Sequence, residues 1–201
     1  MVLATRNSGK LVELRSIFAE AGMVVSDLAD AGMPLESPDE AELEAFDSFA
    51  ENALAKARYF CRLLQCPCVA DDSGLEVAAL GGKPGVRSRR WASDNGMVAG
   101  GEEAANNDYL VQALAAVGDR RARFVCAAAY CDPARELVAM GSVEGSIMDR
   151  ARGGHGFGYD PLFFADALGK TLAEATVAEK QRVSHRGAAF RALVEQIAAG
   201  N

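Results

Sequence analysis

The chain has 201 residues, of which 50% are hydrophobic and 24% charged, and its formal net charge is −7. The apolar share suffices for a packed core and excludes a chain that is disordered throughout. The acidic balance argues against a protein held to nucleic acid by bulk charge, because such domains are usually basic. The length predicts one domain, or two small lobes.

The negative charge is concentrated in one segment. Residues 16–55 contain ten acidic and no basic residues, whereas residues 1–15 have a net charge of +2 and residues 56–201 a net charge of +1. A run of like charges is usually a solvated face, and we expect most of this segment to be one.

The cysteines and the lack of long apolar segments indicate in which cell compartment the protein resides. Five cysteines, an odd number without metal-site spacing, predict reduced thiols. The N-terminus lacks the apolar segment of a signal peptide. No stretch approaches the ~18 apolar residues of a membrane span. We therefore expect a cytoplasmic protein without membrane contact.

Apolar spacing predicts alternating strands and helices in the first part of the chain. Residues 2–5 are typical of a short buried strand, and residues 11–21 of a helix that Gly22 ends. Residues 23–28 predict a second strand. Apolar side chains recur at helical spacing over residues 46–60, and a third strand is predicted at residues 68–70.

The second part continues the alternation. A loop is predicted at residues 81–95, and the elements expected after it are a helix at 104–117, strands at 124–130, 137–143 and 161–164, and helices at 176–179 and 186–199. The two strands flanking Asp132-Pro133 are expected to form a hairpin. The pattern indicates an α/β or α+β fold with a mixed sheet.

The first turn of the chain is a candidate anion site. It lies between a strand and a helix start, and consists of Thr5, Arg6, Asn7, Ser8, Gly9 and Lys10. Free N–H groups, the helix dipole and a lysine favour phosphate there. The segment is not a P-loop, because Ala4 and Leu11 stand where that motif needs Gly and Ser or Thr. An ordinary N-capped turn with a surface lysine is the alternative.

Two adjacent carboxylates follow the third predicted strand. Neighbouring side chains on extended backbone point to opposite sides, so we expect only one of Asp71 and Asp72 to face a cleft. Carboxylates at strand ends commonly hold Mg²⁺, although a turn cap is the alternative. Asn52 and Lys56 lie four apart on one helix face, which could equally be solvated.

The glycine-rich run at residues 153–158 is the most unusual stretch. Four glycines in six residues imply special backbone angles or the close approach of a ligand. Phe157 could stack on a base, and a structural bulge with a core phenylalanine is the alternative. The run is not a dinucleotide fingerprint, because a strand and not a helix is predicted after it.

Three potential donors lie near the C-terminus. Lys180, His185 and Arg186 surround the predicted start of the last helix, where Ser184 is a plausible N-cap. They could bind carbonyl oxygens of a ligand. A histidine beside an arginine is also common on an ordinary surface.

Seven segments, spread over nearly the whole chain, carry a resemblance to one family. They are LATRNSGK (3–10), FAENALAKA (49–57), VADDSGLEV (69–77), GGKPGVRSRRWA (81–92), GGHGFGYDPLFF (153–164), KTLAEAT with AEK (170–180) and SHRGAAF (184–190). In this order they resemble the inosine/xanthosine triphosphate pyrophosphatases. No single segment is decisive, but seven in register are highly specific.

The resemblance implies a fold and an activity. The fold would be α/β, with a long bent mixed sheet flanked by helices and two lobes around a central substrate cleft, in a single domain over residues 1–201. The activity would be Mg²⁺-dependent hydrolysis of nonstandard purine nucleoside triphosphates (ITP, dITP and XTP) between the α and β phosphates. The products would be the monophosphate and pyrophosphate, so that the enzyme cleanses the nucleotide pool. Homodimers are usual in the family.

The resemblance also implies roles for individual residues. Asp72 matches the catalytic carboxylate, a general base for water close to the metal, and Glu44 matches the metal-binding glutamate. Around Glu44 the chain departs from the family, with LEAFDSF where Gly and Thr are usual. Residues 5–10 and Lys56 match triphosphate contacts. The remaining substrate-binding positions are Ser73 and the base-pocket residues Phe157, Gly158, Tyr159, Asp160, Lys180, His185 and Arg186.

The residue chemistry agrees with this family. Ammonium, imidazole and guanidinium donors favour a 6-oxo purine, whereas adenine would leave them unpaired. A Maf-like pyrophosphatase of other base preference is one alternative, against which the Phe157 loop and residues 184–186 argue. A non-catalytic nucleotide-binding module is another, against which Asp72 and Lys10 argue. His155 occupies a position that is often small in the family, and no role is assigned to it.

Overall fold

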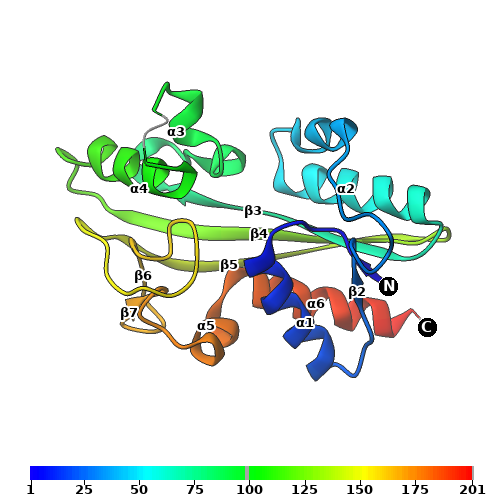
Figure 1. The fold of residues 1–201 in the computed structure, drawn as a ribbon. Helices are drawn as coiled ribbons and strands as arrows, with labels where there is room; N and C mark the ends of the chain where they lie inside the picture. The colour runs from blue at the N-terminus through cyan, green and yellow to red at the C-terminus, as the bar shows by residue number, and fades with distance from the viewer. Residues whose placement is uncertain (98–99, 201) are drawn as a thin grey trace. The chain divides into compact units, whose positions relative to one another are not determined.

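The computed structural model describes residues 1–97 and 100–200. Its internal contacts divide the chain into two units. Unit 1 comprises Met1–Asp72, Cys126–Gly141 and His185–Asn201, and unit 2 comprises Ser73–Val125 and Ser142–Ser184. Both labelled termini belong to unit 1 (Figure 1).

The strands of the described residues form one seven-stranded sheet in the order β2-β1-β3-β4-β5-β6-β7. Strand β1 pairs in parallel with β2 and β3, whereas β6 pairs antiparallel with β5 and β7. The sheet is therefore mixed, and the predicted α/β class is confirmed. The strands are β1 (Val2–Leu3), β2 (Ser26–Asp27), β3 (Cys68–Val77), β4 (Arg121–Cys131), β5 (Glu136–Ile147), β6 (Phe163–Ala165) and β7 (Lys170–Thr171).

Helices flank the strands within each unit. The α-helices are α1 (Ser8–Glu20), α2 (Phe49–Leu64), α3 (Trp91–Asp94), α4 (Glu102–Ala113), α5 (Val177–Val183) and α6 (His185–Ala199). Three 3₁₀ helices accompany them among the described residues, namely η1 (Pro38–Glu44), η2 (Ala78–Leu80) and η3 (Gly85–Arg87).

The core of unit 1 lies between its strands and helices α1 and α6. These two helices cover one face of the strands, and α2 covers the other (Figure 1). Phe18 of α1 meets Phe190 of α6 edge to face, with ring centroids 5.9 Å apart. Both rings pack in one cluster with Val69 of β3 and Ala128 of β4. The burial of these faces fixes the two helix starts that carry Lys10 and Arg186.

Unit 2 has its own core. The rings of Phe124 in β4 and Phe163 in β6 lie 4.7 Å apart, as do those of Trp91 in α3 and Tyr109 in α4. Leu75 of β3 is fully buried in the same cluster as Phe163. Within the described ranges, no helix is both long and apolar enough to cross a membrane.

Three sequence predictions need correction. Strand β3 does not end at residue 70 but continues through both aspartates to Val77. Helix α2 begins only at Phe49, after the N-cap Ser48, so Phe46 lies before the helix and is 46% exposed. The predicted loop at residues 81–95 contains η3 and α3.

Candidate active site

The turn after β1 is an N-capped helix start. Asn7 has extended backbone, and its Oδ1 accepts from the Lys10 N–H at 3.0 Å. The Thr5 hydroxyl oxygen accepts from the Asn7 N–H at 3.3 Å. Ser8 is exposed at the start of α1. The Lys10 ammonium lies 3.0 Å from Asp71 Oδ2, so the turn and β3 are connected within unit 1.

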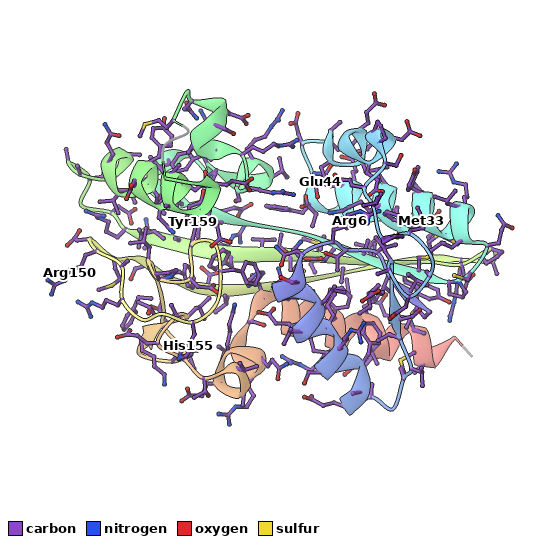
Figure 2. All side chains as sticks on the ribbon, in the orientation of Figure 1. Arg6, Met33, Glu44, Arg150, His155 and Tyr159 are labelled. Carbon is purple, nitrogen blue, oxygen red and sulfur yellow. The ribbon has the colours of Figure 1, made fainter. Side chains whose placement is uncertain are left out.

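Arg6 joins this turn to the acidic segment. Its Nε and Nη2 donate to the two carboxylate oxygens of Glu40, both at 2.7 Å, and its Nη1 donates to the Met33 carbonyl at 3.0 Å (Figure 2). The bidentate bond to Glu40 raises the pKa of Arg6. Burial works to raise the pKa of Glu40, but hydrogen bonds from Arg6 and the Ser37 N–H lower it on balance. Arg6 thus holds η1 against the turn, and its predicted phosphate contact stays a prediction.

Asp71 is the centre of a buried ionic network. Its Oδ2 lies 3.0 Å from Lys10 Nζ and 3.3 Å from Arg186 Nε. Arg186 also donates from Nη1 to Glu13 Oε2 at 2.6 Å. Arg186 and Asp71 are each 2% exposed. Burial alone would lower the pKa of Arg186, but Asp71 and Glu13 raise it, so the guanidinium stays charged.

Asp72 faces a different set of partners. Its Oδ2 accepts from Asn52 Nδ2 at 2.9 Å, and its Oδ1 lies 3.9 Å from Lys56 Nζ. Burial raises the pKa of Asp72, and Lys56 and Asn52 oppose that shift only in part. A carboxylate whose pKa is raised in this way binds a proton more readily, as a general base must.

Lys56 connects Asp72 to Glu44. Its Nζ lies 2.7 Å from Glu44 Oε1, and Glu44 is the last residue of η1. Burial works to lower the pKa of Lys56, but the carboxylates of Glu44, Asp72 and Asp71 outweigh it and raise the pKa. Two carboxylates therefore converge on one buried ammonium group.

A glycine in β5 sets the position of Arg186. A Cβ atom on Gly141 would meet the backbone carbonyl of His185 and the backbone nitrogen of Ala189. Only glycine therefore lets the first turn of α6 lie this close to β5. His185 is 3% exposed and is the first residue of α6, so it lies with Arg186 in unit 1.

In unit 2 the glycine-rich loop folds around Asp160. Asp160 Oδ2 accepts from the Phe157 N–H at 2.9 Å and from Lys180 Nζ at 2.6 Å. Gly156 has φ +80°, and a Cβ there would meet the same carboxylate. The Lys180 ammonium also lies 4.7 Å from the centroid of the Phe157 ring. At Gly156 the group that lies close to the glycine is therefore the Asp160 carboxylate of the protein itself.

The rest of this loop forms one wall of a groove in unit 2. The groove has a volume of about 580 Å³ and runs between the start of α4 (residues 100–107) and residues 154–161. Asn107 Nδ2 donates to the Gly158 carbonyl at 3.0 Å. The Tyr159 hydroxyl donates to the Ser88 carbonyl at 2.8 Å, and burial raises its pKa, so its side chain belongs to the core. His155 is exposed on the groove wall (Figure 2).

The structure thus sorts the predicted site residues into two groups. In unit 1 Asp71 joins Lys10 and Arg186, and Lys56 joins Glu44 and Asp72. In unit 2 Phe157, Asp160 and Lys180 lie together. Ser73 is half-buried on β3 at the start of unit 2.

Sequence reasoning left four contributors without a role, namely Glu13, Glu40, Asn52 and Asp71. The spacing of Asn52 and Lys56 placed those two on one face, but it did not reveal that Asn52 is only 1% exposed.

Two carboxylates of unit 1, those of Glu44 and Asp72, could serve as ligands for a metal ion. Among the described residues, no three or more Asp, Glu, His or Cys side chains cluster in a way that could hold an ion. Glu44 and Asp72 nevertheless both approach the same cationic nitrogen of Lys56. Mg²⁺ is often bound by one or two carboxylates together with water and substrate phosphates. The pair therefore fits a hard divalent cation that is completed by its substrate.

Comparison with known proteins places this geometry in a family. The dITP/XTP pyrophosphatase of Ralstonia nicotianae is 46% identical over 202 residues, which cover 98% of this chain and 96% of that one. The Ham1 protein of Staphylococcus aureus has a similar structure, with a TM-score of 0.82, 34% identity and coverage of 100% and 98%. A HAM1 protein from Coxiella burnetii gives a TM-score of 0.81, 35% identity and coverage of 98% of both chains. The sequence profile of the Ham1 family matches residues 1–196, and the chain belongs to the Ham1 family.

Proposed function

We propose that this protein hydrolyses dITP, ITP and XTP to the nucleoside monophosphate and pyrophosphate, and thereby cleanses the nucleotide pool. The proposal rests on one observation above the others. Asp72 and Glu44 both approach the ammonium of Lys56, and Asp71, the neighbour of Asp72, pairs with Lys10 at the start of α1. The similarity to relatives named dITP/XTP pyrophosphatase supports the same activity.

Unit 1 carries the proposed chemistry on the triphosphate. Asp72 would take the proton of the attacking water, since burial already favours its protonated form. The N–H groups at the start of α1, with Thr5, Asn7, Ser8 and Gly9, would bind phosphate oxygens. Arg6, Lys10 and Lys56 would supply positive charge there.

A divalent cation completes the proposed reaction. Glu44 and Asp72 would hold Mg²⁺, which when bound neutralises phosphate charge and lowers the pKa of water. Lys56 would then be released from between the carboxylates and could turn its ammonium to a phosphate oxygen. This exchange adds one positive charge between the carboxylates, because a divalent cation replaces a monovalent ammonium, and the negative phosphates of the substrate would offset it.

Hydrogen-bond donors of the protein would select the purine base of the substrate. Phe157 offers an aromatic face for stacking, while Ser73 and residues 158–160 would line its surroundings. Lys180, His185 and Arg186 would donate to the 6-oxo group of hypoxanthine or xanthine. Adenine presents an amino group there and would leave buried donors unpaired, so ATP should be a poor substrate.

The assembly and location are part of the proposal. We expect a homodimer in the cytoplasm, with a nucleotide as partner and neither nucleic acid nor membrane. The net charge of −7 supports the absence of a nucleic-acid partner, because long nucleic acids favour basic surfaces. Light scattering after size exclusion measures the mass, and a monomer of 21.2 kDa would contradict the dimer.

The activity is tested with separate substrates. The protein is incubated with Mg²⁺ and ITP, dITP, XTP, GTP or ATP, and pyrophosphate is measured against orthophosphate. We expect pyrophosphate from the first three, with kcat/KM at least about a hundredfold above that for ATP. An Asp72→Asn preparation controls for contaminating phosphatases. Release of orthophosphate alone, or ATP hydrolysed as fast as ITP, would refute the proposal.

A further inference from the structure

We propose that Asn52 is a positioning residue that fixes the distance between the carboxylates of Asp72 and Glu44. The inference rests on the proposed function, because it concerns the same two carboxylates. It assigns to Asn52 no contact with the substrate or with the reacting atoms.

The side-chain amide of Asn52 holds two parts of unit 1 at once. Its Nδ2 donates to Asp72 Oδ2 at 2.9 Å and to the Phe46 carbonyl at 3.1 Å, and its Oδ1 accepts from the Phe46 N–H at 2.9 Å. Both amide protons are therefore committed. Phe46 lies two residues after Glu44, so the amide connects the carboxylate of β3 to the segment that carries the other carboxylate.

The amide is rigid in this position. Asn52 is 1% exposed and lies in the first turn of α2, where its backbone N–H donates to the Ser48 carbonyl at 3.0 Å. Rotation of the amide would break two bonds to Phe46 and leave buried polar groups without partners, which is costly. The paired bonds to one residue also prevent residue 46 from sliding along α2.

Asn52 and Lys56 both hold Glu44 and Asp72 in place, but they do so through different interactions. Lys56 attracts Glu44 and Asp72 through charge, at 2.7 and 3.9 Å. A charge tolerates a range of distances, whereas three directional hydrogen bonds do not. When a metal ion replaces the ammonium, the amide would keep the spacing that both carboxylates need. Loss of the amide should therefore weaken metal binding and catalysis more than nucleotide binding.

The chain offers a matched control in Asn106 of unit 2. Asn106 is 5% exposed, its Oδ1 accepts from the Ala92 N–H at 2.8 Å, and its Nδ2 donates to the Arg89 carbonyl at 2.7 Å. Asn106 is thus a buried asparagine in a helix, and like Asn52 it uses its side-chain Oδ1 and Nδ2 to anchor a segment that precedes the helix. Asn52→Ala and Asn106→Ala should lose similar structural anchoring, and only the first removes a bond to Asp72.

The test compares these variants with the parent protein. For Asn52→Ala we expect kcat for ITP to fall about tenfold to hundredfold, as for other hydrogen bonds to a charged group, with KM within threefold. Mn²⁺ binding to the nucleotide-free protein, measured by electron paramagnetic resonance, should weaken at least threefold. Asn106→Ala should change neither kcat nor Mn²⁺ affinity by more than threefold.

A second variant covers the possibility that Asn52→Ala does not fold. Asn52→Asp keeps the side-chain volume and the acceptor for the Phe46 N–H, but it has no proton for Asp72. We expect its kcat to fall at least as far as that of Asn52→Ala. A folded Asn52→Ala or Asn52→Asp protein with kcat and Mn²⁺ affinity within threefold of the parent would overturn the proposal, as would equal losses in Asn106→Ala. If the parent itself releases no pyrophosphate, the proposed function fails instead.

Discussion

Asp71 and Asp72 are consecutive residues of β3, yet their carboxylates have separate partners. Asp71 Oδ2 lies 3.0 Å from Lys10 and 3.3 Å from Arg186, whereas Asp72 Oδ2 accepts from Asn52 at 2.9 Å. The alternation of side chains along a strand accounts for this division. One carboxylate holds cations of α1 and α6, and the other is available for chemistry beside α2.

The first prediction concerns Asp72. Asp72→Asn should lower kcat about 10²- to 10⁴-fold, because the variant cannot take a proton from water. Its side-chain oxygen can still accept from Asn52, so the fold should be kept. Isothermal titration with a non-hydrolysable α,β-methylene analogue of ITP should give an affinity within about threefold of the parent. A kcat within tenfold of the parent would remove Asp72 from its role.

The second prediction concerns the buried pair of Glu13 and Arg186. Glu13→Gln should lower the free energy of unfolding by about 3 kcal/mol, because it leaves a buried guanidinium with less compensation. Urea unfolding measures the loss. Glu136→Gln is the matched control, since Glu136 makes an equally close bidentate pair with Arg58, at 2.7 and 2.6 Å, on the surface. That change should cost less than about 1 kcal/mol, and equal losses would contradict the argument from burial.

The third prediction concerns the glycine-rich loop. Gly156→Ala should lower the free energy of unfolding by about 1–3 kcal/mol, because the residue has φ +80° and its Cβ would meet the Asp160 carboxylate. The displaced carboxylate should also raise KM for ITP through Lys180 and Phe157. Gly154→Ala is the control from the same loop, as a Cβ there meets no atom within 4 Å. If the two variants have the same unfolding curves and the same KM values, the position of the Asp160 carboxylate does not depend on Gly156.

The fourth prediction is a pH dependence. The pKa of Glu40 lies below its ordinary value of 4.5, so its pair with Arg6 stabilises the fold above that pH. This stability should disappear as the pH falls through the lower pKa of the folded state. Glu40→Gln should therefore be less stable than the parent at pH 7, by about 1–3 kcal/mol, and equally stable at strongly acid pH.

Thermal unfolding from pH 7 down to pH 3 follows that difference. Glu42→Gln serves as the control, because Glu42 is an exposed residue of the same 3₁₀ helix. A constant difference between parent and Glu40→Gln at every pH would mean that the charge of Glu40 is not responsible.

The sequence predicted those features that depend on the spacing of nearby residues, such as helix faces and the alternation of side chains along a strand. The apolar residues Leu14, Ile17 and Phe18 recur at helical intervals and do form the buried side of α1. Adjacent strand residues alternate, so the opposite directions of Asp71 and Asp72 were also predictable, and this prediction is confirmed by their contacts. The same periodicities predicted an α/β or α+β fold with a mixed sheet, and the family resemblance narrowed this to α/β.

The partners of individual charges could not be predicted in this way. Arg186 and Glu13 are 173 positions apart, and Arg6 and Glu40 are 34 apart, so no local pattern links them. The extension of β3 past residue 70 was missed for the same reason. Two buried aspartates are unusual in a strand, and the cations that compensate them, Lys10 and Arg186 at Asp71 and Lys56 at Asp72, come from other elements of the chain.

The position of Lys56 between Glu44 and Asp72 has a consequence for biosynthesis. Two neighbouring carboxylates, one of them buried, would repel each other and oppose folding without a counter-ion, but here the chain supplies its own positive charge. We therefore expect the chain to reach its native state without a divalent cation, unlike small metal-dependent domains that unfold without their ion. Chelation by EDTA should leave the circular dichroism spectrum and melting temperature of the protein unchanged while it stops turnover.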